Sequence, residues 1–249
     1  MKKSFMLMLA ASLVTVTSAQ AAEANKADES PWKSEVELGF IRTTGNTETQ
    51  TTAIKADATY EVDKWRHNAH AEGYGQQSKV DTGETVVSAE RYELSGKSDY
   101  KFSELDYAFG LLKLQKDRFS GYVYDHIVSA GYGRKLIKQD DMELDVEIGP
   151  GARIFKVDAT PDASGETEAV LRMSGKYWWA ITGNSKFTQE LNTEIGETIT
   201  SSQSITGVQA NINSTLALKF TYTLRHKTKV PQGNEKLDTE TAMTLVYSF

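Results

Sequence analysis

The feature that most constrains the fold of this chain is a two-residue alternation of apolar and polar side chains, repeated in segment after segment. In the stretch LALKFTYTL, every second residue from Leu216 to Leu224 is apolar or aromatic, and the residues between them are mostly Lys or Thr. A period of two is typical of a β-strand that presents an apolar face on one side and a polar face on the other. The sequence therefore predicts an all-β protein.

We expect about twelve such strands, separated by turn-like clusters. They lie at 33–43, 50–62, 65–78, 85–101, 106–117, 122–137, 142–155, 168–181, 186–199, 205–214, 217–229 and 238–249. The links near 63, 103–104, 139–141, 183–184 and 214 are tight, whereas those near 45, 79–84, 159–166, 201–203 and 231–237 are mostly longer, and the link at 120–121 is short. Tight links that alternate with longer ones predict a single antiparallel up-and-down sheet with both chain ends on one side.

One apolar and one polar face fit two architectures. A soluble barrel or sandwich turns its apolar face inward, whereas an outer-membrane barrel turns it toward lipid and its polar face toward the lumen. Aromatic residues favour the second, because they gather near the tight links as an interfacial girdle requires. This set comprises Trp65, Tyr60, Phe102, Tyr107, Trp179, Phe187, Phe220, Tyr247 and Phe249, and a thinner set at the other end includes Phe40, Tyr74, Phe119, Tyr124 and Phe155. We therefore predict a closed antiparallel transmembrane β-barrel.

The first residues indicate export. Lys2 and Lys3 precede an apolar run from Phe5 to Val16, and Ala19-Gln20-Ala21 follows it. This is the layout of a signal peptide, and the apolar run is shorter than the roughly 20 residues that a spanning helix needs. We expect a cleaved signal peptide at 1–21, a flexible lead-in at 22–31 and the barrel at 32–249, located in the cell outer membrane after passage through the periplasm.

Composition excludes several classes of partner. The formal net charge is −6, and removal of Lys2 and Lys3 with the signal peptide makes it more negative. That balance argues against nucleic acid, which favours basic surfaces. The chain has no cysteine, so a disulfide framework or a lipid-modified N-terminal Cys is not available. We expect outer-membrane lipid as a partner and no cofactor.

The polar face carries the candidate functional residues. In a barrel its charges would line the lumen, pair across strands and set which solutes pass. The candidates are Lys55, Asp57, Arg91, Lys97, Asp145, Glu147, Arg153, Arg172, Lys176, Glu190, Glu194, Lys219, Arg225 and Lys227. Barrels of about eight strands are filled by side chains and those of about sixteen hold an aqueous channel, so twelve leaves an open and a plugged lumen as alternatives.

Catalytic and metal signals are weak. Among the histidines only His70 falls on the polar face, two residues from Glu72, and no nucleophile motif accompanies it. The acidic cluster Asp140, Asp141 and Glu143 lacks the spacing of a calcium loop and is interpreted as a solvated turn. The Gly-Tyr-Gly of SAGYG is interpreted as relief of crowding in a curved sheet rather than an ion filter. We predict that the protein is not an enzyme and holds no metal.

Three stretches resemble a known family. ELGFIRTTGNTETQTT (37–52), the Lys64-Trp65 pair and PQGNEKLDTETAMTLVYSF (231–249) are similar to a proteobacterial family of salt-induced outer-membrane proteins whose molecular function is unknown. The Thr44–Thr47 turn, Asp238-Thr239 and the terminal Phe are its most specific parts. The resemblance implies an outer-membrane barrel and supplies no catalytic residues.

The chain ends on an alternating strand rather than a polar tail. Met243, Leu245, Tyr247 and Phe249 share one face. This pattern resembles the terminal-strand signal that the bacterial barrel-assembly machinery recognises, so we expect that machinery as a partner during biogenesis. Because an open sheet edge cannot be left in lipid, this strand is predicted to pair with the first near Glu35–Ile41. The functional prediction is a passive pore for ions or small solutes linked to salt or osmotic stress, and the alternative is a closed barrel with a structural or enzymatic envelope role.

Overall fold

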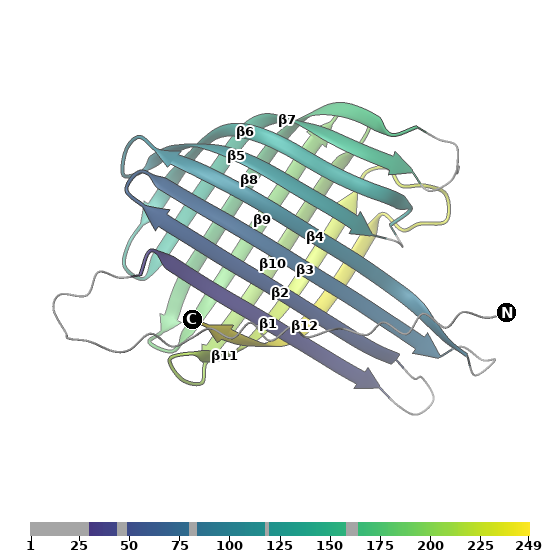
Figure 1. Ribbon diagram of the computed structural model, residues 1–249, viewed down its shortest axis with the longest axis horizontal. Helices are drawn as coiled ribbons and strands as arrows, with labels where there is room; N and C mark the ends of the chain where they lie inside the picture. The colour runs from purple at the N-terminus through teal and green to yellow at the C-terminus, as the bar shows by residue number, and fades with distance from the viewer. Residues whose placement is uncertain (1–29, 44–48, 80–83, 118–119, 158–163) are drawn as a thin grey trace. The chain divides into compact units, whose positions relative to one another are not determined.

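The chain forms a closed antiparallel barrel of twelve strands, which confirms the predicted fold (Figure 1). The computed structural model describes residues 30–43, 49–79, 84–117, 120–157 and 164–249. The strands are β1 (Trp32–Thr43), β2 (Thr49–Val62), β3 (Trp65–Lys79), β4 (Thr85–Lys101), β5 (Asp106–Asp117), β6 (Tyr122–Lys138), β7 (Met142–Val157), β8 (Glu166–Thr182), β9 (Ser185–Gly196), β10 (Thr200–Asn211), β11 (Leu216–Lys227) and β12 (Leu237–Ser248). No helix in this part of the chain is long and apolar enough to cross a membrane. The predicted signal peptide, most of the lead-in, the Thr44–Thr47 turn and Phe119 lie outside the described residues.

The barrel closes through its first and last strands, as predicted. The ladder between β1 and β12 runs from Glu35 opposite Ser248 to Leu38 opposite Leu245. Directly next to this ladder, at the chain end, the backbone of Phe249 exchanges two hydrogen bonds with the backbone of Ser34, at 3.0 and 3.2 Å. The terminal residue therefore continues the strand and belongs to the closing contact.

Two strands, β9 and β10, differ from the prediction by three residues or more. The ninth strand ends at Gly196 rather than 199, and the tenth spans Thr200–Asn211 rather than 205–214. The run of Ser, Thr and Gln at 200–204 reads as a loop in the sequence, but it pairs with both β9 and β11. The true turn is the short 197–199 segment, where the Glu168 carboxylate accepts a hydrogen bond from the Thr198 backbone N–H at 2.9 Å. This hydrogen bond joins residues that are 30 positions apart, so the local alternation of apolar and polar residues does not reveal the turn.

The apolar side chains of the strands face outward. On β11, Leu218, Phe220 and Tyr222 are each more than 40% exposed, and Leu245 and Tyr247 of β12 are similar. An apolar outer wall of this kind is suited to lipid rather than to water.

Three aromatics predicted as girdle residues point inward instead. Tyr107 is 1% exposed and Phe155 is 2% exposed. Tyr74 lies under Arg91, whose guanidinium carbon is 5.0 Å from the ring centroid. Each shares its strand face with luminal charges, because the pleat alternates and an aromatic side chain can pack on an interior cation as readily as on lipid.

Glycines allow a close approach of β6 and β7. A Cβ added at Gly149 would lie 2.2 Å from the Ala130 carbonyl oxygen, and one at Gly131 would lie 2.3 Å from the Ile148 carbonyl oxygen. Because these carbonyl oxygens belong to the backbone, they cannot move away without distorting the strands. The SAGYG stretch, which contains Gly131, thus has a packing explanation.

We expect Gly149→Ala to lower the stability of the barrel by about 1–3 kcal/mol, the usual cost of overpacking. Gly96→Ala is the matched control, because a Cβ there would meet nothing within 4 Å. The measurement is the temperature at which the folded, fast-migrating band on a gel converts to the unfolded band. Equal temperatures for the two variants would contradict this reading of the β6–β7 contact.

Candidate functional site

The interior of the barrel is crossed by ion pairs. Arg91 of β4 reaches Glu240 of β12 at 2.9 Å, and Lys113 of β5 reaches Glu194 of β9 at 3.0 Å. Lys227 of β11 reaches Asp125 of β6 at 2.9 Å. None of these strands are neighbours in the sheet, so the side chains must meet across the lumen. The polar strand faces therefore point inward.

Each charge predicted to line the lumen takes part in an ion pair with another side chain. The pairs are Lys55–Glu72, Asp57–His70, Arg91–Glu240, Lys97–Glu147, Asp145–Lys135, Arg153–Asp125, Arg172–Glu147, Lys176–Glu190, Glu194–Lys113, Lys219–Glu37, Arg225–Glu240 and Lys227–Asp125.

One cluster fills the lumen toward the end that carries the longer loops. Arg153 is 1% exposed and donates from Nε to Asp125 at 2.7 Å and from Nη2 at 2.5 Å. Lys227 donates to the same carboxylate and lies 4.2 Å from the Tyr122 ring centroid. Tyr122 in turn packs against Phe155 in the buried apolar cluster. The bidentate hydrogen bond to Asp125 and the neighbouring aromatic faces thus compensate the buried positive charge of Arg153.

A second cluster lies nearer the short turns. Glu147 accepts hydrogen bonds from Arg172 at 2.8 Å, from the Tyr107 hydroxyl at 3.1 Å and from Lys97. The Arg172 guanidinium carbon lies 5.4 Å from the Phe109 ring centroid. Glu147 thus ties β4, β5 and β8 to its own strand, β7.

Another part of the interior is open to water. Lys176 of β8 and Glu190 of β9 pair at 3.2 Å, yet their side chains are 67% and 35% exposed. Asp57 of β2 is 49% exposed and accepts from His70 of β3 at 2.8 Å. The two pairs lie on opposite sides of the closed sheet, and both present charge to a part of the lumen that a solute can contact, in contrast to the dry Arg153 cluster.

The two ends of the barrel differ. The short-turn end holds a cavity of about 740 Å³ whose lining includes Lys33, Glu61, Arg66, Lys101, Lys135 and Glu143. At the other end the link between β11 and β12 reaches across the mouth, where the Lys229 carbonyl accepts from the Tyr122 hydroxyl at 3.4 Å. A Cβ at Gly121 would lie 2.8 Å from the Pro231 ring, so this link also packs on the β5–β6 turn. The longer-loop mouth is therefore partly covered.

His70 has carboxylate neighbours rather than a nucleophile. Its Nδ1 lies 2.8 Å from Asp57, and its Nε2 lies 4.0 Å from Glu72. Ser95 is opposite it in the register of β3 and β4, but the described ring contacts are with the acids. The absence of enzymatic activity stays a prediction.

Several interior charges were missed by the sequence reasoning. They are Arg66, Glu72, Asp99, Lys113, Asp125, Glu168 and Glu240. The strand period could have found Asp99 and Glu168, which share the polar phase of β4 and β8 with the identified charges Lys97 and Arg172, and also Arg66 and Glu72, which share that of β3 with His70. On β5, β6 and β12 no inward charge was identified that could mark the phase of Lys113, Asp125 and Glu240. Asp99, for example, is two residues from Lys97 and is fully buried.

A closed barrel with an apolar outer wall and a charged interior defines a transmembrane β-barrel of the outer-membrane type. The chain belongs to the family described as "Protein of unknown function, DUF481", whose model matches residues 36–249. A relative, "Uncharacterized protein YdiY" of Escherichia coli (strain K12), is 29% identical over 219 residues, which cover 88% of this chain and 83% of the relative.

Two solved barrels share the fold. The NanC porin has a TM-score of 0.52 at 9% identity and covers 86% of this chain and 98% of its own. The translocator domain of the autotransporter NalP from Neisseria meningitidis has a TM-score of 0.50 at 10% identity, with 88% and 89% covered. At such identities the likeness shows the outer-membrane barrel fold alone.

Proposed function

We propose that the protein is a narrow passive pore for ions and small polar solutes in the outer membrane. The observation that carries this proposal is the water-exposed pair of Lys176 and Glu190 inside a barrel whose outer wall is apolar. Charged side chains that stay hydrated in a lumen attract small ions without binding them tightly, as conduction requires. The cavity at the short-turn end gives solutes an entrance on that side.

The location is part of the proposal. The protein is exported with cleavage after Ala21, inserted by the barrel-assembly machinery and held in outer-membrane lipid. The experiment is fractionation of cells with N-terminal sequencing of the mature protein, together with a gel that compares heated and unheated samples. Recovery from the soluble periplasm would overturn the location and with it the pore.

The exposed ion pair should set charge selectivity. We expect Lys176→Glu to shift the reversal potential under a KCl gradient toward cation selectivity, because it replaces a cation at the water-exposed wall with an anion. Glu190→Lys is the matched reverse change and should shift the potential the other way. Identical reversal potentials for both variants and the native protein would show that ions do not pass this wall.

The link to salt stress rests on the family resemblance. We propose that the pore helps the envelope adjust to high external salt. A strain that lacks the protein is then expected to recover more slowly after a shift to high NaCl, and native protein, but not a variant that cannot conduct, should restore recovery.

A closed barrel with an envelope role is the second candidate. The ion pairs that cross the lumen and the covered mouth favour it, because Arg91–Glu240 and Lys227–Asp125 narrow the path. Folded protein that never conducts would select this candidate over the pore.

A further inference from the structure

The link between β11 and β12 crosses the longer-loop mouth of the barrel. This link, residues 228–236, is called the crossing segment below. Its tip is a tight turn, in which the Asn234 N–H donates to the Pro231 carbonyl at 3.2 Å. Gly233 in this turn has a positive φ of 92°, a conformation that glycine adopts without strain. The tip is therefore a defined turn.

The tip reaches the opposite side of the mouth. It lies on Gly121, where an added Cβ would be 2.8 Å from the Pro231 ring and 2.5 Å from the Asn234 side-chain nitrogen. The next residue, Tyr122, donates from its hydroxyl to the Lys229 carbonyl at 3.4 Å. Because β6 starts at Tyr122 and stands opposite β12 in the closed sheet, the crossing segment divides the mouth into two halves.

The half of the mouth bounded by β6–β11 is filled by apolar side chains. Tyr122, Phe155 and Ile199 pack together and are each 2–4% exposed. The guanidinium carbon of Arg153 lies 5.6 Å from the Tyr122 ring centroid and 5.2 Å from the Phe155 ring centroid. A hydrated solute would have to separate these rings and expose a buried ion pair in order to pass. We therefore call it the sealed half.

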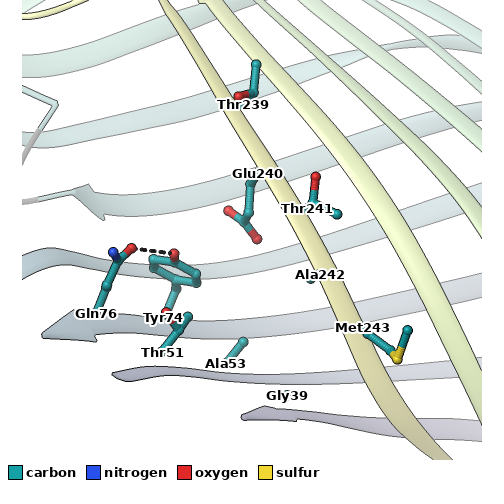
Figure 2. Close-up of a pocket in the computed structure, with 10 residues that line it drawn as sticks. All are labelled: Gly39, Thr51, Ala53, Tyr74, Gln76, Thr239, Glu240, Thr241, Ala242 and Met243. Atoms are coloured by element: carbon teal, nitrogen blue, oxygen red, sulfur yellow. Dashed lines mark hydrogen bonds between the residues drawn. The ribbon is translucent and has the colours of Figure 1, made fainter. Parts of the chain in front are cut away.

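The half bounded by β12 and β1–β5 holds a cavity of about 240 Å³. Figure 2 shows Tyr74 and Gln76 of β3 beside Thr51 of β2, with Glu240 of β12 facing them. Thr51, Gln76 and Glu240 each lie two or three residues from the longer-loop end of their strand. Hydroxyl, amide and carboxylate groups thus line a space just inside the mouth.

Five charged side chains adjoin this cavity. Arg91 stacks on Tyr74 and reaches Glu240 at 2.9 Å, and Arg225 reaches the same carboxylate at 3.0 Å. Lys55 and Arg91 also pair with Glu72. We call these residues the Arg91 network: Lys55, Glu72, Arg91, Arg225 and Glu240. Their side chains are 9–17% exposed, and three cations against two carboxylates (3 − 2) give a net charge of +1.

The Arg91 network lies between the cavity and a water-exposed part of the lumen. Asp57 and His70 lie two residues from Lys55 and Glu72, on the same inner faces of β2 and β3 and nearer the short turns. The Asp57 side chain is 49% exposed. A solute that passes the network from the cavity therefore meets hydrated charges next.

We propose that solutes cross the longer-loop half of the barrel only on this side of the crossing segment, and that the Arg91 network is a constriction that favours small anions. One excess cation at a narrow point attracts anions, as rings of Arg and Lys do in anion-selective pores. The inference rests on the proposed pore, and it adds the route through the mouth and the class of ion.

The route is tested with single cysteines, because the chain has none. Ala242→Cys places a thiol in the cavity, and Ile199→Cys places one in the sealed half. Folded protein in detergent is treated with a water-soluble methanethiosulfonate, and modification is followed by mass spectrometry. We expect Ala242→Cys to react about tenfold faster or more, because a thiol at a buried position reacts only after local opening. Equal rates, or faster reaction of Ile199→Cys, would overturn the route whether or not the barrel conducts.

The constriction is tested by the reversal potential under a KCl gradient. Arg91→Met removes a positive charge from the network and should shift the potential toward cation selectivity. Lys227→Met removes the same charge from the sealed half, where Asp125 keeps its bonds from Arg153, and should shift it far less. Should Arg91→Met not fold, Arg225→Met gives the same readout, because it leaves the ion pairs of Arg91 in place.

The outcomes separate the constriction from the pore. A shift for the network variants no larger than that for Lys227→Met would overturn the constriction and leave the pore. Native protein that folds but never conducts would overturn the pore and the constriction together. In that case the reactivities of the two thiols still show which half of the mouth admits solutes.

Discussion

Deleting Phe249 is expected to lower the amount of assembled barrel about tenfold or more. The deletion removes the two backbone hydrogen bonds to Ser34 from a seam whose ladder spans only Glu35–Leu38 on β1. At about 0.5–1.5 kcal/mol each, those bonds correspond to roughly a tenfold change. Assembly is measured as the fraction of protein in outer-membrane fractions that shows heat-modifiable migration.

Phe249→Ala separates the two roles of this residue. The ring is 69% exposed and lies 5.7 Å from the Tyr247 ring, so its loss leaves the backbone bonds in place. If the ring is read as an assembly signal, this variant should assemble poorly in cells but refold into detergent as well as the native protein. Normal assembly of Phe249→Ala in cells would contradict a signal role, and normal assembly of the deletion would contradict both roles.

Arg153→Met should produce the largest loss of stability among single luminal changes. Arg153 is buried on two aromatic rings and holds Asp125 through two hydrogen bonds. Removing one member of a buried ion pair costs about 3–5 kcal/mol, and the lower end of this range is expected because Asp125 keeps its hydrogen bond from Lys227. The free energy of unfolding is measured by urea titration of the refolded protein in lipid vesicles.

Lys176→Met is the control for this change. Its ion pair with Glu190 is largely hydrated, and such pairs contribute about 0–1 kcal/mol. A loss for Lys176→Met as large as that for Arg153→Met would show that the interior is uniformly dry. That result would also remove the observation on which the pore proposal depends.

Most of the fold could be predicted from sequence because the barrel alternates its faces strictly. The period of two located most strands to within two residues, and the apolar ending led directly to the observed pairing of β12 with β1. It failed at β10, where Thr200–Ser204 carries too few apolar side chains to mark a strand, although both neighbouring strands pair with it. It also failed at Tyr107, because Tyr107, Phe109 and Leu111 make the inner face of β5 as apolar as its outer face, and only Lys113 marks it as luminal.

The site could be predicted only in outline. The strand phase indicates that Arg91 faces inward. Its partner Glu240 is 149 residues away in the sequence, and the two side chains meet only because closure of the sheet places β4 and β12 opposite each other across the lumen. The division of the interior into a dry part around Arg153 and a wet part around Lys176 depends on such cross-lumen contacts. The ladder between β1 and β12, which ends at Leu38, also depends on contacts between strands that are distant in the sequence, and no local sequence pattern predicts where it ends.

Single-channel recording in planar bilayers tests the central claim most directly. Protein that migrates as a folded, heat-modifiable species is added to one side, and current is recorded in KCl. We predict small discrete conductance steps whose reversal potential shifts in opposite directions for Lys176→Glu and Glu190→Lys. Folded protein that inserts into the bilayer and gives no steps would contradict a pore and leave the closed barrel.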